Sequence, residues 1–110
     1  MKKIETESAR TQMRKGMLEF CTMLIISRGK AYTSDILREL KSADLLVVEG
    51  TLYPLLSRLK TQEVLDYEWE ESKSGPPRKY YTLTATGRQT LSQSKEAWKD
   101  LVRSISSLTT

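Results

Sequence analysis

Apolar residues near the start of the chain recur at helical spacing. Between Gln12 and Ser27 they lie three or four residues apart, at Met13, Met17, Phe20, Cys21, Leu24 and Ile25. This spacing predicts one amphipathic helix over that range, with Cys21 as a buried thiol on its apolar stripe. Gly29 is expected to end the helix, since glycine readily takes the left-handed conformation found at helix C-termini.

Two more helices are predicted in the following segment. The second runs from Ser34 to Lys41 and is capped by Thr33 or Ser34. The third begins near Gly50 or Thr51, because Pro54 fits a first turn, where the amides have no helical partner. Its buried face has an i, i+3, i+4, i+7 pattern of leucines, at Leu52, Leu55, Leu56 and Leu59.

The period then changes from helical to alternating. After Glu63 apolar and acidic residues alternate, which predicts a half-buried strand from Leu65 onward. A turn is predicted at Ser72–Pro77 and a second strand at Arg78–Leu83. Three helices followed by a hairpin is the element order of a winged helix-turn-helix domain. The expected fold class is therefore mainly α with a small β-hairpin.

A long final helix is predicted to follow Gly87 and to reach about Leu108. Its apolar positions are spaced as in the seam of a coiled coil, at Leu91, Trp98, Leu101, Ile105 and Leu108, with Ser94 as a polar interruption. Residues 1–84 are expected to form the winged helix-turn-helix domain, and residues 85–110 a C-terminal dimerisation helix. The alternative is that this stripe packs on the first helix of its own chain.

The amino-acid composition limits which functions are expected. One cysteine and no histidine leave no usual zinc ligand set, so neither a metal nor a cofactor is expected. The sequence contains no evident nucleophile-base pair, so an enzyme is not expected. The longest apolar stretch, Met17–Ile26, is too short for a membrane span, and the chain shows no signal-peptide core. A cytoplasmic protein is therefore expected, and the net charge of +4 is compatible with nucleic-acid binding.

Two long strings carry a resemblance to a known family. Residues 49–59 read Glu-Gly-Thr-Leu-Tyr-Pro-Leu-Leu-Ser-Arg-Leu, and residues 75–84 read Gly-Pro-Pro-Arg-Lys-Tyr-Tyr-Thr-Leu-Thr. With residues 16–19 (Gly-Met-Leu-Glu) and Gly87, they resemble the PadR-like family of transcriptional regulators from about Lys15 onward. The resemblance implies a winged-helix repressor that dimerises through a single C-terminal helix. Family members commonly respond to small aromatic or drug-like compounds.

Two positions depart from the family pattern. Thr33 follows Tyr32 where the family usually has glycine, and Glu63 stands where glycine usually follows the recognition helix. If Glu63 is left-handed, it costs roughly 1 kcal/mol relative to glycine.

A helix-turn-helix protein places the N-terminal part of its second helix in the major groove. Residues expected near base edges are Thr51, Tyr53, Pro54 and Ser57, whereas Arg58 is expected at a phosphate. The hairpin is expected to add phosphate contacts through Lys73, Arg78 and Lys79. Its acidic residues are expected to face away from DNA and to pair with Arg78 or Lys79. The structural alternatives are that Tyr53 covers the hairpin, that Thr51 and Pro54 only begin the helix, and that the hairpin cations are solvated.

Trp98 is an unusually large residue for a coiled-coil seam. Two copies near a two-fold axis would sandwich a flat aromatic compound, whereas the alternative is packing against the first helix. The expected partners are thus double-stranded DNA, a second copy of the chain and a small aromatic effector. The remaining alternative is a winged-helix protein-interaction module that does not bind DNA.

Overall fold

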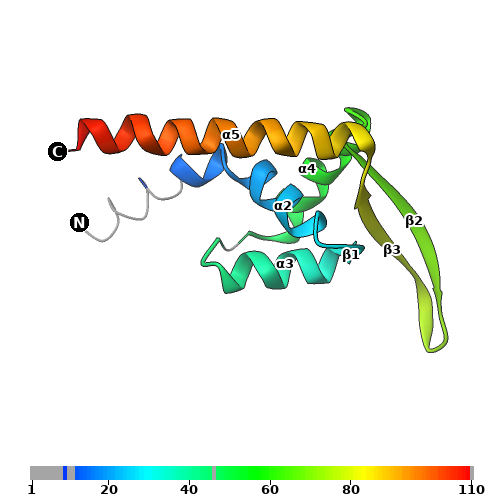
Figure 1. Ribbon diagram of the computed structural model, residues 1–110. Helices are drawn as coiled ribbons and strands as arrows, with labels where there is room; N and C mark the ends of the chain where they lie inside the picture. Colours follow the sequence, from blue (N-terminus) through cyan, green and yellow to red (C-terminus); the bar gives the residue numbers. More distant parts are fainter. Residues whose placement is uncertain (1–8, 10–11, 46, 110) are drawn as a thin grey trace, which may run out of the picture.

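The structure is a computed structural model that describes residues 9, 12–45 and 47–109. Its helices and strands are α2 (Leu18–Ile26), β1 (Ala31–Tyr32), α3 (Thr33–Ser42), α4 (Glu49–Thr61), β2 (Leu65–Ser72), β3 (Gly75–Leu83) and α5 (Ala85–Leu108). Figure 1 shows α5 lying along one side of the helical body, with the β2–β3 hairpin extending away from it. The predicted fold class, mainly helical with a winged helix-turn-helix order, is confirmed.

The first predicted helix is interrupted. Residues 12–15 are helical, a turn follows at Gly16 and Met17, and α2 begins only at Leu18. The Met17 amide donates to the Arg14 carbonyl at 2.9 Å, which closes that turn. The low helix propensity of glycine explains why the break lies here and why the prediction of one continuous helix was wrong.

Helix α2 is apolar on two sides. Thr22, Met23 and Ile26 face the core and are buried. Met13 is exposed, and the residues of the predicted stripe from Met17 onward are only half-buried. Cys21 is one of them, so the expected buried thiol is a half-buried one.

Helix α3 begins at Thr33 and is capped differently from the prediction. Its N-cap is Tyr32, and neither Thr33 nor Ser34 caps it. Instead, the Tyr32 amide donates to the Asp35 carboxylate at 3.1 Å. This hydrogen bond, followed by the one that Arg38 donates, lowers the pKa of Asp35.

Helix α4 begins at Glu49, slightly earlier than predicted, and its leucine face is buried as expected. Pro54 consequently lies inside the helix rather than in its first turn. Proline has no N–H, so the Gly50 carbonyl lacks its helical partner. Both residues are exposed, which leaves that carbonyl accessible to water.

The sheet is antiparallel, with the strand order β1-β3-β2. The predicted hairpin is present, but its turn is confined to Lys73 and Ser74, and residues 75–77 belong to β3. The short strand β1, which the sequence did not predict, pairs with β3 only at Tyr80 and Tyr81. Beyond β1 one edge of β3 is free, and prolines are tolerated at such an edge.

Contacts among four residues hold the end of α4 close to the start of α5. Glu63 is left-handed, with a φ of 63°, as the departure from glycine suggested. The Thr84 hydroxyl donates to the Glu63 carbonyl at 2.6 Å and accepts the Gly87 amide at 2.9 Å. A Cβ on Gly87 would lie 2.0 Å from the Val64 carbonyl oxygen, so only glycine allows this approach.

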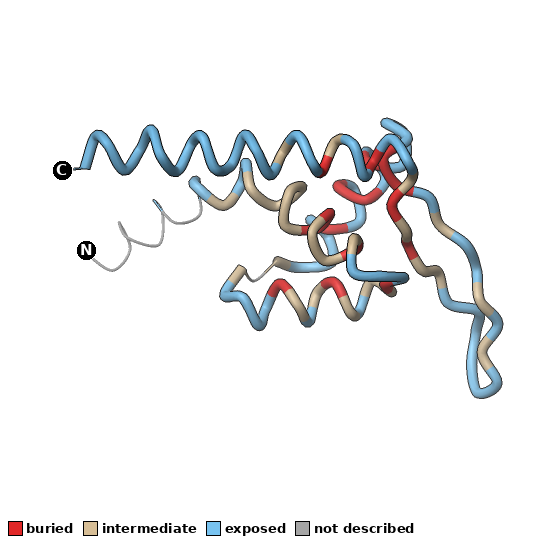
Figure 2. The backbone as a smooth tube through the Cα atoms, in the orientation of Figure 1, coloured by how far each residue is buried: buried red, intermediate tan, exposed pale blue. Residues whose placement is uncertain are grey.

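The core lies at one end of α5. Figure 2 shows buried residues in the helical body and where α5 begins, whereas most of the rest of α5 and the tip of the hairpin are exposed. Leu91 is the last buried residue of this helix, at 4 % exposure. Over the described residues, no helix has the length and apolarity needed to cross a membrane.

Candidate nucleic-acid interface

The solvent face of α4 carries the polar residues that the sequence singled out. Thr51, Tyr53, Pro54, Ser57 and Arg58 are all exposed. They lie opposite the buried leucines because helical periodicity separates the two sets. This face presents two hydroxyls, a phenol and a guanidinium on one rigid element.

Arg58 differs from its neighbours because it has an intramolecular partner. Its Nε and Nη2 donate to one carboxylate oxygen of Glu19 in α2, at 2.7 and 2.5 Å. Both side chains are about half exposed. The cation is therefore partly neutralised in the free protein, which the sequence could not indicate because Glu19 lies in a different helix.

The hairpin cations occupy different environments. Lys73 is exposed in the turn. The Arg78 guanidinium lies 3.9 Å from the centre of the Tyr32 ring and donates to the Ser34 hydroxyl at 3.2 Å. Lys79 Nζ lies 4.2 Å from the ring centre of Tyr67. Arg78 and Lys79 thus lie against aromatic rings, although Arg78 is exposed like Lys73.

A cleft of about 380 Å³ lies between the hairpin, the start of α3 and Tyr53 of α4. It is lined by Tyr32, Thr33, Ser34, Tyr53, Trp69, Arg78, Lys79 and Tyr81. The cleft brings together three residues that were predicted as DNA contacts, Tyr53, Arg78 and Lys79. It also contains Ser34 and Trp69, which sequence reasoning missed. The 64 % exposure of Trp69, on the otherwise apolar face of its strand, is a property that only the structure reveals.

The acidic residues of the hairpin have partners of their own. Glu68 accepts from the Tyr80 hydroxyl at 2.8 Å, and Glu70 accepts from Lys30 at 2.5 Å and from the Tyr32 hydroxyl. The hydrogen bonds from Lys30 and Tyr32 lower the pKa of Glu70, and the same carboxylate raises the pKa of both donors. Glu70 lies opposite Arg78 across the strands, but the predicted pairing with Arg78 or Lys79 was wrong, since Lys30 from another segment reaches it.

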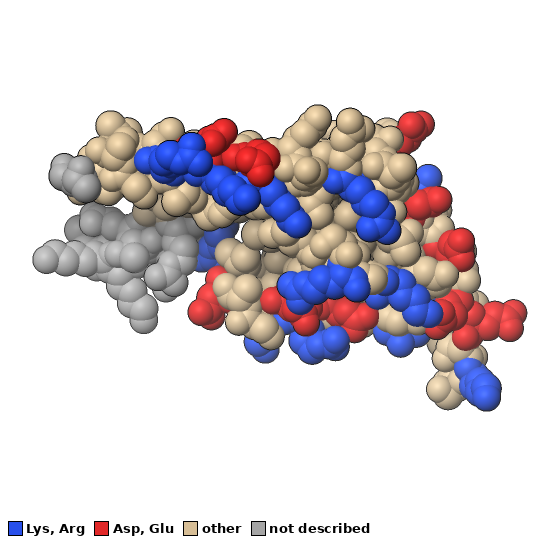
Figure 3. All heavy atoms as spheres, viewed as in Figure 1, with Lys and Arg blue, Asp and Glu red and all other residues tan. Residues whose placement is uncertain are grey.

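Charge alone does not mark this interface. On the face shown in Figure 3, basic and acidic side chains are intermixed over α5 and the helical body. Among the described residues there is no cluster of histidine, cysteine or carboxylate side chains that could hold a metal ion.

The exposed part of α5 carries a second candidate surface. Trp98, Leu101, Ile105 and Leu108 from the predicted seam are 45 to 83 % exposed. The predicted seam was wrong to include Leu91. This residue is buried in the core of its own chain and has little surface left for a partner. The apolar stripe that is open to a second chain therefore begins after Leu91.

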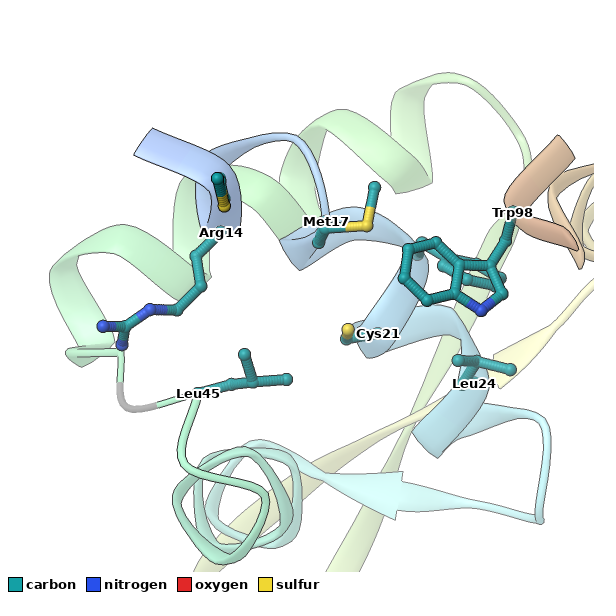
Figure 4. A pocket seen from close by; sticks show the side chains of 8 residues that line it. Arg14, Met17, Cys21, Leu24, Leu45 and Trp98 are labelled. Atoms are coloured by element: carbon teal, nitrogen blue, oxygen red, sulfur yellow. The ribbon is translucent and has the colours of Figure 1, made fainter. Parts of the chain in front are cut away.

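Trp98 also borders an apolar pocket of about 390 Å³. Figure 4 shows its indole on one side of this pocket, with Met17 and Cys21 beside it and Arg14 at the far end. The ring centres of Trp98 and Phe20 are 6.4 Å apart, so Trp98 does pack against the first helical region. Partial burial raises the pKa of the Cys21 thiol, which makes it a weak nucleophile at neutral pH.

Comparison with known proteins agrees with this architecture. The model of the transcriptional regulator PadR-like family matches residues 23–93, which include α3, α4 and the hairpin. The chain belongs to the PadR-like family. A PadR-like transcription factor from Bacteroides fragilis is 52 % identical, with a TM-score of 0.78 over 92 % of this chain and 98 % of the other. A PadR-like regulator from Bacillus cereus is 33 % identical, with a TM-score of 0.80 over 90 % and 97 %.

One solved PadR structure includes its DNA. Bacillus subtilis PadR in complex with operator DNA matches with a TM-score of 0.64 and 22 % identity, over 69 % of this chain and 45 % of that one. This likeness concerns the fold. The present chain is thus a PadR-family transcriptional regulator, whose solvent-facing α4 is the second helix of the helix-turn-helix.

Proposed function

We propose that this regulator binds double-stranded DNA as a homodimer and represses transcription in response to a small aromatic effector. The observation that carries DNA binding is the exposed polar face of α4 beside a cleft whose lining, among the residues that the structure describes, includes two cations and no carboxylate. Such a face suits the major groove, and adjacent cations suit the backbone. Residues 1–84 would bind DNA and residues 85–110 would dimerise, in the cytoplasm.

The exposed stripe of α5 supports the dimer. Leu101 and Ile105 are about half exposed in the isolated chain, next to Trp98. A contiguous apolar stripe of this kind is unfavourable in water and is covered when two copies pack symmetrically. Two-fold symmetry would then place two α4 helices on half-sites of a palindromic operator.

The pocket beside Trp98 supports the effector. Its lining is almost entirely apolar and includes two aromatic rings, Phe20 and Trp98. A flat aromatic compound would stack on the indole, and its proximity to the α5 stripe would couple binding to the spacing of the two subunits. In a Trp69→Phe background, a planar aromatic dye should change Trp98 fluorescence and DNA affinity together. Unchanged fluorescence and affinity would refute this effector site.

The experiment that tests the function is selection of bound duplexes from a random-sequence DNA pool at near-physiological salt. A palindromic consensus is the expected result, and it would support both DNA binding and the dimer. A consensus with one half-site would refute the dimeric arrangement. If no duplex is enriched with or without aromatic compounds, the proposal of DNA binding is refuted. The alternative, a winged-helix protein-interaction module, is then favoured.

A further inference from the structure

Trp69 is an exposed aromatic residue beside the proposed DNA-contacting residues but not among them. It is 64 % exposed in the middle of a strand, where a large apolar side chain would ordinarily be covered. It lies directly opposite Lys79 across the hairpin, and Lys79 Nζ is 5.5 Å from the centre of its ring. The cation therefore holds the indole from one side and leaves the rest of its surface open.

The cleft beside Trp69 combines the groups that a sugar–phosphate chain requires. Tyr53 and Trp69 provide apolar ring surface, Ser34 a hydroxyl, and Arg78 and Lys79 positive charge. The contact of Arg78 with the Tyr32 ring and its hydrogen bond to Ser34 hold the guanidinium in the lining of the cleft. Glu70 lies opposite Arg78 on the same face of the hairpin, but its carboxylate already accepts from Lys30 and from the Tyr32 hydroxyl. The Glu68 carboxylate accepts from the Tyr80 hydroxyl.

The location of the cleft fits its composition. When α4 lies in the major groove and the hairpin reaches the adjacent minor groove, the strand that separates these grooves must pass between the two elements. On the proposed function, we infer that this cleft holds the sugar–phosphate backbone of one DNA strand and that Trp69 packs on a deoxyribose there. Trp69 is thus a positioning contact that fixes how α4 enters the groove.

The first test uses affinity for the selected duplex. Trp69→Ala should weaken binding on the order of tenfold, a loss typical of one well-packed contact, and Trp69→Phe should restore much of it. Tyr80→Phe is the matched control, because it alters an aromatic residue on the opposite face of the same hairpin and keeps the ring. Its affinity should remain within about twofold of the parent protein.

The second test reports on contact directly. The chain has two tryptophans, so Trp98→Phe leaves Trp69 as the single indole. Addition of the duplex should shift Trp69 emission and reduce its quenching by acrylamide at the concentrations where DNA anisotropy reports binding. Bound DNA with unchanged emission and quenching would overturn the inference and leave the proposed function intact. No anisotropy change with the parent protein at any concentration would overturn both.

Discussion

The Arg58 guanidinium in α4 binds Glu19 in α2 through two nitrogens, at 2.7 and 2.5 Å from one carboxylate oxygen. This ion pair connects the solvent face of α4 to α2. It also means that a cation expected at a phosphate is already paired in the free protein. Exposed pairs of this kind are worth little in stability, so DNA can replace the partner at small cost.

Arg58→Ala should weaken binding to all duplex sequences and reduce the salt dependence of binding by about one unit of slope, because one phosphate contact is lost. Glu19→Gln should strengthen binding to all duplex sequences and increase the salt dependence, since it releases Arg58 from the Glu19 carboxylate. Affinity measured against salt concentration on selected and unrelated duplexes checks both variants. A loss confined to the selected sequence would contradict the phosphate role.

Thr51→Ala and Ser57→Ala should reduce discrimination between selected and mismatched duplexes by roughly 1 to 3 kcal/mol if their hydroxyls contact base edges. Both residues are exposed on α4, and Thr61, also exposed but at the far end of the same helix, provides the control as Thr61→Ala. Competition binding with single-mismatch duplexes measures the effect. Equal affinity of mutant and parent for every sequence would assign the hydroxyls to solvent.

If the chain forms the proposed dimer, Leu101→Asp or Ile105→Asp should yield monomers and abolish specific DNA binding, because a charge would enter the apolar stripe of α5. Arg103→Asp is the control, since Arg103 lies on the opposite side of the helix by heptad position and is paired with Asp100. Sedimentation velocity gives the oligomeric state. A dimer that survives both stripe variants would refute this seam.

Leu91→Ala should instead lower the free energy of unfolding by about 2 to 5 kcal/mol, as for a core residue.

Asp35 should make folding stability depend on pH in the acid range. The Tyr32 amide and Arg38 hold its pKa below the ordinary value in the folded chain. The unfolded chain, with an Asp pKa of about 3.9, then binds more protons at intermediate pH. The stabilisation is therefore complete well above pH 4 and is lost as the pH falls through 3.9 toward the folded pKa. Urea unfolding from pH 6 to pH 3 should show a shallower decline for Asp35→Asn than for the parent protein or Asp100→Asn.

Gly87→Ala should destabilise the fold by about 3 kcal/mol or more, since the new Cβ would lie 2.0 Å from the Val64 backbone oxygen and neither element can move freely. Gly50→Ala is the matched substitution, because nothing lies within 4 Å of a Cβ in that helical position. It should be neutral or stabilising by up to about 1 kcal/mol. Denaturant midpoints compare the two variants, and equal midpoints would contradict the close approach.

The hydrophobic pattern by itself determined the order of the main helices and the hairpin, although not the short strand β1. The leucine spacing of α4 predicted its buried face, and the alternation after Glu63 predicted the hairpin, because local periodicity decides which side of an element can be buried. The same periodicity separated the exposed residues Thr51, Tyr53 and Ser57 from the core. The left-handed Glu63 also followed from a position where glycine was expected.

Contacts between distant segments could be decided only by the tertiary structure. The pairing of Glu19 with Arg58, the bond from Lys30 to Glu70 and the burial of Leu91 each depend on how separate elements pack. The seam spacing of α5 is regular from Leu91 to Leu108, so the sequence could not show that Leu91 belongs to the core and the later residues to the open stripe. Periodicity fixes the faces of each element, whereas packing decides what each face meets.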